Sequence, residues 1–524
     1  MNLKYILTGA LLIGISSASI SQKLPGTADS TFNGNGYGLF NFGDKTAQGI
    51  SGLIGPDGKL IAAGGSLSAT LKWNVGISRI NLDGSDDMTF RSNSGPSNID
   101  FNNGAGDHIN TIIKHPDGGY LAVGGIAGAN GLDVLVIRFT DQGNVDLNFG
   151  SGGIFTHQVD PGYEAASHIL VDSKGRIVIF GDVPNTLKQM FIMRLYPYGG
   201  LDVSFSGDGI LFVDPLNASN SPVALLERPL GGYYMVCNTH GNSESKVTVQ
   251  SISENGNLNI DLGGAGEVSL KLETFNTTAT EAIFHNGSIF ICGNYDGPQG
   301  NQDGFLARLE TDGTWNSSFA GTGYARILHN LSNPHEEEVR GMEIAPDSSI
   351  FIVTLCHTPD TLTLIQSRFK SDGNVEGFYG NKNGSHHNYS LYDSISEFSI
   401  DNIVLDTGAK RLYIMGQQNT PSQDGFFVYA TYTGNFAQAQ SGGGTGLSSP
   451  TQNLTVYPNP ASNWLHLDLD DSKGIIVKIF DLQGREVMEA NSTQIDIKTL
   501  NKGMYVVQAS QFDRLYTAKI QVID

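Results

Sequence analysis

Apolar and polar residues alternate over short runs along most of this chain of 524 residues. In a typical stretch, residues 109–115, 120–125 and 134–140 form three such runs, separated by segments rich in Gly, Asp, Asn and Pro. Alternation with a period of two between turn residues is typical of β-strands, whereas apolar residues at helical spacing would indicate helices. The pattern predicts an all-β protein built from many short strands.

A turn followed by an apolar strand recurs seven times, at a spacing of roughly 60 residues. We aligned the copies on the turn residue, which is Gly58, Gly118, Gly175, Gly231, Gly287, Ser348 or Lys410. A regular period of this length indicates a repeat architecture, so each unit is expected to form one supersecondary element.

Each unit predicts four antiparallel strands, which together make one propeller blade. The seventh unit ends at Phe436 after its third strand, and residues 29–42 at the front of the chain contain the missing fourth strand with its loop. We therefore predict a seven-bladed β-propeller over residues 22–436, closed by an N-terminal strand. Closure removes the open sheet edge that a linear array of repeats would leave.

The repeat carries a Pro-Asp-Gly turn and an Asp-x-x-Phe-Gly-x-Gly loop, seen most clearly at residues 116–118 and 146–152. These motifs resemble the delta-60 repeat of secreted bacterial proteins, which implies a propeller. The fourth unit departs from the pattern with Leu262 in place of Phe, and the sixth has a longer loop at residues 376–387.

An Arg recurs in the third strand of five units, and an acidic residue stands three positions before the loop aromatic in five. Bidentate Arg–carboxylate pairs would hold the loop in place, so we interpret these residues as structural pairs and not as a catalytic ring. They are Arg79, Arg138, Arg194, Arg308 and Arg368, with Asp29, Asp87, Asp146, Asp202 and Glu376.

Charge and composition narrow the choice of partners. Lys and Arg number 31 against 52 Asp and Glu, a net charge of −21, which disfavours nucleic acid and anionic membranes. Residues 1–21 combine Lys4, an apolar run and small residues, as in a secretory signal peptide, and no membrane span is expected in the mature chain. The cysteines Cys237, Cys292 and Cys356 are odd in number, and we expect them to be buried free thiols.

The character of the chain changes after the propeller. Residues 437–452 are rich in Gly, Ser and Gln and predict a flexible linker. Residues 453–524 contain at least five short alternating runs, which predict a small β-sandwich.

This last segment resembles the C-terminal sorting domain of the type IX secretion system (Por secretion) of Bacteroidetes. The matching residues are Tyr457, Pro458, Asn459 and Pro460, then Asp481 and Gly484, then Leu500, Gly503 and Tyr505. The resemblance implies export across the outer membrane by the type IX machinery, and thus a secreted or cell-surface protein.

Candidate chemistry is sparse in the sequence, and we expect no catalytic residues, no metal site and no cofactor. Calcium is the one alternative, because Asp107, Glu164 and Glu337 stand near the predicted starts of inner strands and would attract a cation at the channel mouth. Solvated loop carboxylates are the other interpretation.

The leading functional hypothesis is a non-enzymatic binding, adhesion or scaffold module for an extracellular glycan or protein, acting through loops on one propeller face. The alternative is a secreted hydrolase or lyase at the channel mouth, which requires His335, His386 or His387 to converge with carboxylates. A structural envelope component without a discrete ligand is a third possibility.

Overall fold

The computed structural model describes residues 24–523 apart from short gaps, which are 44–45, 69–70, 102–105, 163, 184–188, 215–218, 242–243, 298–299, 330–335, 358–361, 378, 381–384, 389–396, 421–422, 435–451, 455, 468, 470–474, 482–485, 491 and 512–513. The predicted signal peptide and nearly all of the predicted linker lie outside the described residues. The helical segments that the structure describes are two short turns, α1 (Phe90–Asn93) and η2 (Phe319–Gly321).

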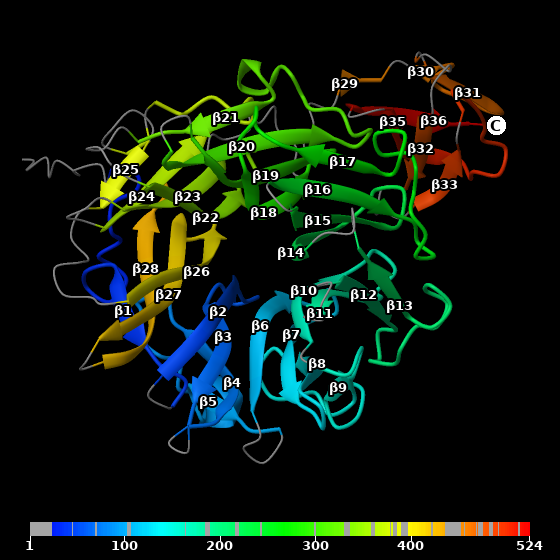
Figure 1. Ribbon diagram of the computed structural model, residues 1–524. Helices are drawn as coiled ribbons and strands as arrows, with labels where there is room; N and C mark the ends of the chain where they lie inside the picture. The colour runs from blue at the N-terminus through cyan, green and yellow to red at the C-terminus, as the bar shows by residue number, and fades with distance from the viewer. Residues whose placement is uncertain are drawn as a thin grey trace, which may run out of the picture.

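Seven four-stranded antiparallel sheets form a ring around a central axis (Figure 1). We call them blades 1 to 7, and in each the first strand lies nearest the axis. Blades 1 to 3 comprise β2 (Thr46–Ile54), β3 (Leu60–Leu67), β4 (Trp73–Ile80) and β5 (Ser97–Ile99); β6 (Asp107–Lys114), β7 (Tyr120–Ala127), β8 (Leu132–Phe139) and β9 (Ile154–His157); and β10 (Ala165–Val171), β11 (Ile177–Val183), β12 (Gln189–Leu195) and β13 (Ile210–Val213).

Blades 4 to 6 repeat the same order of strands. They comprise β14 (Ser219–Glu227), β15 (Tyr233–His240), β16 (Ser245–Ile252) and β17 (Glu267–Leu270); β18 (Thr277–His285), β19 (Ser288–Asp296), β20 (Gln302–Glu310) and β21 (Tyr324–Ile327); and β22 (Glu336–Ile344), β23 (Ile350–His357), β24 (Leu362–Phe369) and β25 (Ser385–Asn388).

Blade 7 joins the two ends of the propeller. Its inner three strands are β26 (Glu397–Asp406), β27 (Arg411–Thr420) and β28 (Gln423–Tyr432), and its outermost strand is β1 (Tyr37–Phe40). β1 pairs antiparallel with β28, with Tyr37 opposite Tyr429 and Phe40 opposite Phe426. The predicted all-β propeller, closed by an N-terminal strand, is therefore confirmed.

The core lies between the blades and not at the axis. The middle strands are buried on both faces, as in β3 and β7, because each blade packs against a neighbour on either side. One apolar cluster, for example, joins Ile77 of blade 1 to Ile109 and Tyr120 of blade 2. This explains why the second and third strands of a unit read as nearly continuous apolar runs.

The loop between the third and fourth strands also connects neighbouring blades. Its aromatic residue is buried, as with Phe205, and Leu262 fills the same place in blade 4. The residue after it has a left-handed backbone and donates its N–H to the next blade. Such bonds at 2.7–3.0 Å run from Asn33, Arg91, Gly150, Ser206, Gly263 and Ala320.

The C-terminal residues form a separate β-sandwich, as predicted. One sheet has the order β29 (Gln452–Asn453), β36 (Arg514–Val522), β35 (Gly503–Gln511), β32 (Ile475–Phe480) and β33 (Glu486–Ala490); the other has β30 (Val456–Tyr457), β31 (Trp464–Leu467) and β34 (Gln494–Asp496). Leu465, Val477, Ile479, Val507 and Ile520 are fully buried between them.

Replacing Ser206 by glycine is expected to stabilise the propeller. Ser206 is exposed with φ near +53°, a conformation that costs an L-residue about 1 kcal/mol and costs glycine little. We expect Ser206→Gly to raise the free energy of unfolding by about 0.5–1 kcal/mol in urea titrations. The control is Ser204→Gly in the same loop, which removes the 2.6 Å hydrogen bond from Ser204 Oγ to Asp202 and should destabilise. A Ser206→Gly protein no more stable than wild type would contradict this account.

Candidate functional site

Every inner strand carries a β-bulge at mid-length, where its pairing with the second strand shifts. A bulge leaves backbone groups unpaired and re-aims side chains. Here the bulges lie at the same height in all seven blades, at residues 49–50, Asn110, Ser167, Val223, Thr280, Arg340 and Asp401. Their side chains and those of adjacent residues therefore gather around the axis.

Side chains next to the bulges bond to the backbone of the following blade. Asn402 accepts from Gly52 N at 3.0 Å, and Ser51 Oγ accepts from Ile112 N at 3.2 Å. Glu281 Oε2 accepts from Met342 N at 2.7 Å. These side chains thus provide hydrogen-bond acceptors for backbone N–H groups near the bulges. The same hydrogen bonds link successive blades around the axis.

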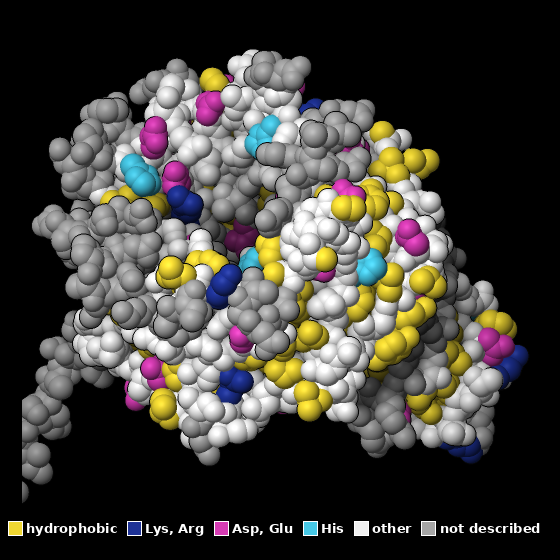
Figure 2. All heavy atoms as spheres, turned by 60° about the horizontal axis from the view of Figure 1, so that its bottom comes forward, with side chains coloured by type: hydrophobic (Ala, Val, Ile, Leu, Met, Phe, Trp, Pro, Cys, Tyr) yellow, Lys and Arg dark blue, Asp and Glu magenta, His cyan; other side chains and the backbone are white. Residues whose placement is uncertain are grey.

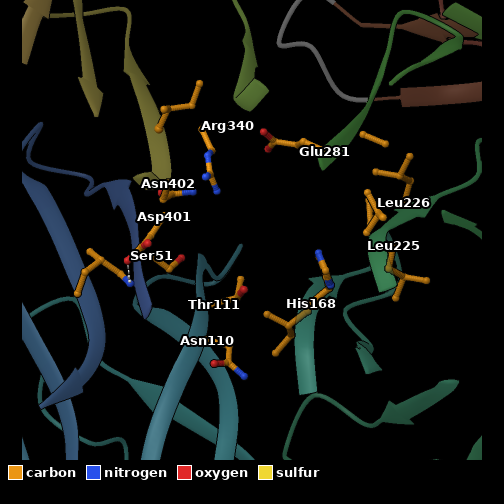
Figure 3. Close-up of a pocket in the computed structure, with 16 residues that line it drawn as sticks. Ser51, Asn110, Thr111, His168, Leu225, Leu226, Glu281, Arg340, Asp401 and Asn402 are labelled. Atoms are coloured by element: carbon orange, nitrogen blue, oxygen red, sulfur yellow. Dashed lines mark hydrogen bonds between the residues drawn. The ribbon is translucent and has the colours of Figure 1, made fainter. Parts of the chain in front are cut away.

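A cavity of about 310 Å³ occupies the axis at the level of the bulges (Figure 3). Six inner strands contribute at least one polar side chain to its wall, whereas β14 contributes only apolar ones. The polar residues are Ser51, Asn110, Thr111, His168, Glu281, Arg340, Asp401 and Asn402; the β14 residues are Val223, Ala224, Leu225 and Leu226. The centre of the ring is visible as a hollow with acidic, basic and histidine side chains around it (Figure 2).

Arg340 is the bulge residue of β22, and its guanidinium points into the cavity (Figure 3). Its Nη2 donates to Glu338 on the same strand. Its Nε is buried and has no hydrogen-bond partner among the described residues. A buried guanidinium donor without a partner carries a desolvation cost, which a ligand acceptor in the cavity would relieve.

Glu281 points into the cavity from the neighbouring blade (Figure 3). Burial raises its pKa to about 7, although the N–H of Met342 favours the carboxylate. Glu343 follows Arg340 by three residues on β22. Burial, and then the charge of Glu281, raises the pKa of Glu343 to about 8. Both carboxyl groups are therefore partly protonated near neutral pH.

His168 and Asp401 complete the titratable groups in the cavity wall. Burial lowers the pKa of His168 to about 4, so the ring is neutral at neutral pH. Asp401 is held by Ile50 N at 3.1 Å, Gln417 Nε2 at 2.9 Å and Ser399 Oγ at 2.8 Å. The wall therefore offers both donors and acceptors.

The cavity residues were not singled out from the sequence. A usable signal was present, because the bulge lies seven to nine residues before each turn residue, within the first strand of the unit. In that column Asn110, Ser167, Val223, Thr280, Arg340 and Asp401 differ in charge and size from blade to blade. The next position varies as well, with Thr111, His168, Glu281 and Asn402 among its residues, so the blade itself specifies neither position.

The predicted Arg–carboxylate pairs lie between loop and strand, away from the cavity. Three occur between the residues named above: Arg79 Nε–Asp87 at 2.7 Å, Arg194 Nε–Asp202 at 2.7 Å and Arg368 Nε–Glu376 at 2.8 Å. Two of these guanidinium groups also lie over the loop aromatic, Arg79 at 4.8 Å from Phe90 and Arg194 at 4.7 Å from Phe205.

The other predicted pairs take different partners. Arg138 donates to Gly118 O at 2.7 Å, because the two-glycine turn at residues 118–119 brings this carbonyl to it, and Asp146 accepts from Asn148. Arg308 pairs with Glu310 at 3.1 Å, since Asn316 replaces the loop carboxylate.

In blade 7 the cation comes from a different strand. Tyr429 stands at the usual Arg position of the third strand, and Asp29 instead pairs with Arg411 of the second strand at 2.7 Å. This ion pair fastens the N-terminal loop into the last blade.

The acidic residues predicted near the channel mouth are buried, and the solvated interpretation is wrong for them. Each accepts a backbone N–H from the loop before its own strand: Asp107 from Phe101 at 2.7 Å, Glu164 from Asp160 at 2.8 Å and Glu337 from His329 at 2.7 Å. In the part of the chain that is described, no three His, Cys, Asp or Glu side chains could together hold a metal ion.

The structure does not test the histidines of the hydrolase alternative. His335 and the side chains of His386 and His387 lie outside what the structure describes. The three cysteines are buried and free, as predicted, and burial raises the pKa of each thiol.

Most of the sorting-motif residues lie near the first strands of the sandwich, around β30, and on or just before its late strand β35. Asn459 is bonded to β36, through Lys519 O at 2.9 Å and Gln521 N at 2.9 Å. Tyr505 donates to Asn501 O at 2.8 Å, and Tyr457 is exposed and stacks on His466. Pro458 and Pro460 both follow cis peptide bonds, Leu500 packs on the sandwich core, and Gly484 lies outside the described residues.

Residues 455–523 match the family model of the secretion system C-terminal sorting domain, which confirms the predicted domain type. This domain marks the protein for type IX export to the cell surface or extracellular space. Among the described residues, no helix has both the length and the apolar character needed to cross a membrane. A search of curated proteins finds no match.

Several solved structures are similar in fold at low identity. A polysaccharide lyase, PL25 ulvan lyase bound to -[GlcA(1-4)Rha3S]-, is 10% identical, with 75% of this chain and 95% of that chain covered and a TM-score of 0.37. A neuraminidase-like protein of A/flat-faced bat/Peru is 11% identical, with coverages of 79% and 98% and a TM-score of 0.38. The GH43 BlXynB protein from Bacillus licheniformis is 10% identical, with coverages of 92% and 88% and a TM-score of 0.29.

Removing Arg411 is expected to weaken ring closure. Arg411→Ala leaves Asp29 buried without its cation, which should lower the free energy of unfolding by about 3–5 kcal/mol. Arg138→Ala is the matched control, because Arg138 is half-buried and bonds to a carbonyl; we expect a loss of about 1 kcal/mol. Equal losses in urea titrations of the two variants would contradict the closing role of Arg411.

Stability should fall as pH rises through the range where buried Glu337 ionises. Burial, followed by the nearby Asp303, raises the pKa of Glu337 to about 7 from 4.5 in an unfolded chain. The folded state therefore loses stability above pH 4.5, by roughly 3 kcal/mol at most for this group.

Glu337→Gln keeps an acceptor for His329 N and removes the charge. We expect it to raise the melting temperature relative to wild type at pH 8 but not at pH 5. Glu336→Gln, at the exposed neighbouring position, is the control and should change neither value. A variant that gains as much at pH 5 as at pH 8 would show that ionisation of Glu337 is not the cause.

Proposed function

We propose that this exported protein is a binding module and that its ligand site is the axial cavity. The ligand class that fits is a small hydroxyl-rich molecule, such as one sugar unit of an extracellular glycan. Binding is thereby placed in the axial cavity and not, as predicted from the sequence, on the loops of one propeller face.

The mixed wall of the cavity is the observation that carries this proposal. Hydroxyl groups both donate and accept hydrogen bonds, so they match a wall in which Arg340 and Asn402 supply N–H groups and Glu281 supplies oxygens. The apolar residues of β14 face a different side, where the C–H face of a sugar ring can pack. The volume of about 310 Å³ suits one such unit.

Arg340 and Glu281 are the two residues expected to contact the ligand directly. They project from adjacent blades into the same cavity (Figure 3). Arg340 has a buried N–H without a partner among the described residues, and Glu281 lines the same cavity with one of its oxygens engaged by Met342 N. Neighbouring hydroxyls of one ring would satisfy both.

A second candidate function is a hydrolase or lyase acting in the same cavity. It is favoured by Glu281, whose pKa of about 7 suits a general acid, with the positive charge of Arg340 nearby. The two candidates share contact residues and differ in whether a glycosidic bond is broken.

Titration of the full-length protein with monosaccharides tests the binding proposal. We expect saturable binding of at least one of glucose, galactose, mannose or rhamnose by saturation-transfer NMR. Arg340→Gln and Glu281→Gln should each weaken it roughly 10-fold or more. Arg326→Gln is the matched control, because Arg326 has similar exposure and a Glu partner but lies on an outer strand.

Either of two results would overturn the binding proposal. One is the absence of binding by every sugar, and the other is binding that both cavity variants leave unchanged. Release of reducing ends from oligosaccharides, lost in Glu281→Gln, would instead favour the enzyme.

A further inference from the structure

A second hollow lies beside the axial cavity, at the Pro-Asp-Gly-like turns of blades 3 to 5. Its volume is about 640 Å³, and it lies between the ends of β10, β14 and β18. It shares three wall residues with the axial cavity, namely Leu225, Leu226 and Ala282. The two spaces therefore adjoin at these three residues.

The second hollow is lined mainly by apolar side chains. Leu170, Val171, Leu226, Ile283 and Phe284 are each half-buried, so part of every side chain remains exposed. We call this surface the apolar groove. Exposed apolar surface of this kind is favourable to cover with an apolar group.

The charged side chains beside the apolar groove have partners within the protein, although Arg228 Nε has no hydrogen-bond partner among the described residues. Glu227 accepts from Ser173 N at 2.8 Å. Arg228 lies over the ring of Tyr234 at 5.4 Å and within 3.7 Å of Asp261. Tyr234 in turn stacks on Phe284 at 6.1 Å, which holds the floor of the groove. A ligand there gains mainly by apolar contact.

We propose that the ligand of the axial cavity carries an apolar substituent, an alkyl or aryl group, that lies in the apolar groove. This inference rests on the proposed sugar-binding function. The shared wall of Leu225, Leu226 and Ala282 is the reason for assigning both parts to one molecule. The hydroxyl-rich part occupies the cavity, and the substituent leaves it over β14.

A chain-length series separates this inference from the function on which it rests. Methyl, butyl and hexyl glycosides of glucose, galactose, mannose and rhamnose are titrated calorimetrically into the full-length protein, below micelle-forming concentrations. We expect affinity to increase about 2- to 4-fold per methylene, as for burial of apolar surface. Methyl glycosides that bind with no increase along the series would overturn the substituent and leave sugar binding intact. No binding by any glycoside would overturn both.

Groove variants locate the effect. Phe284→Ser should flatten the dependence on chain length and leave the affinity for the methyl glycoside unchanged. Val171→Ser is the second variant, should Phe284→Ser fail to fold. Phe212→Ser, which removes an exposed Phe from an outer strand of blade 3, should retain the full dependence. A dependence that persists in both groove variants would overturn the assignment to this groove.

Discussion

The whole propeller depends on covering both faces of every blade. A four-stranded sheet whose middle strands are apolar on both sides cannot stand alone in water, so each blade needs two neighbours. A ring meets this requirement for all seven sheets, provided that its ends join. The pairing of β1 with β28, held by Asp29 and Arg411, joins them and covers the outer edge of β28.

The axial cavity follows from the same geometry. Seven strands that converge on one axis cannot all remain regular and face one another, and each is bulged at the same height. The bulge frees backbone groups, which side chains such as Ser51 and Asn402 bind from the next blade. Within the described part of the chain, Arg340 makes no such bond to the next blade and faces the cavity, where burial raises the pKa of Glu281.

Repetition and variation within the units have different meanings in this fold. The Arg–carboxylate pairs and the buried loop aromatics recur because every blade must join its loop to its neighbour. The residue at the bulge position differs from blade to blade, because the fold requires an extra residue there but no particular side chain. A column with Arg in one blade and Val in another makes the cavity asymmetric, with one apolar wall and several polar ones.

By itself the sequence determined the strand content, the period, the ring closure and the sorting domain, because alternation, turn residues and short motifs are local signals. Only the tertiary structure decided which residues meet at the axis. Glu281, Arg340 and His168 come from different blades and carry no shared motif, and the pKa values of Glu281 and His168 depend on burial. The partner of Asp29 was also settled in three dimensions, since Arg411 is almost the whole propeller away in sequence and adjacent only after closure.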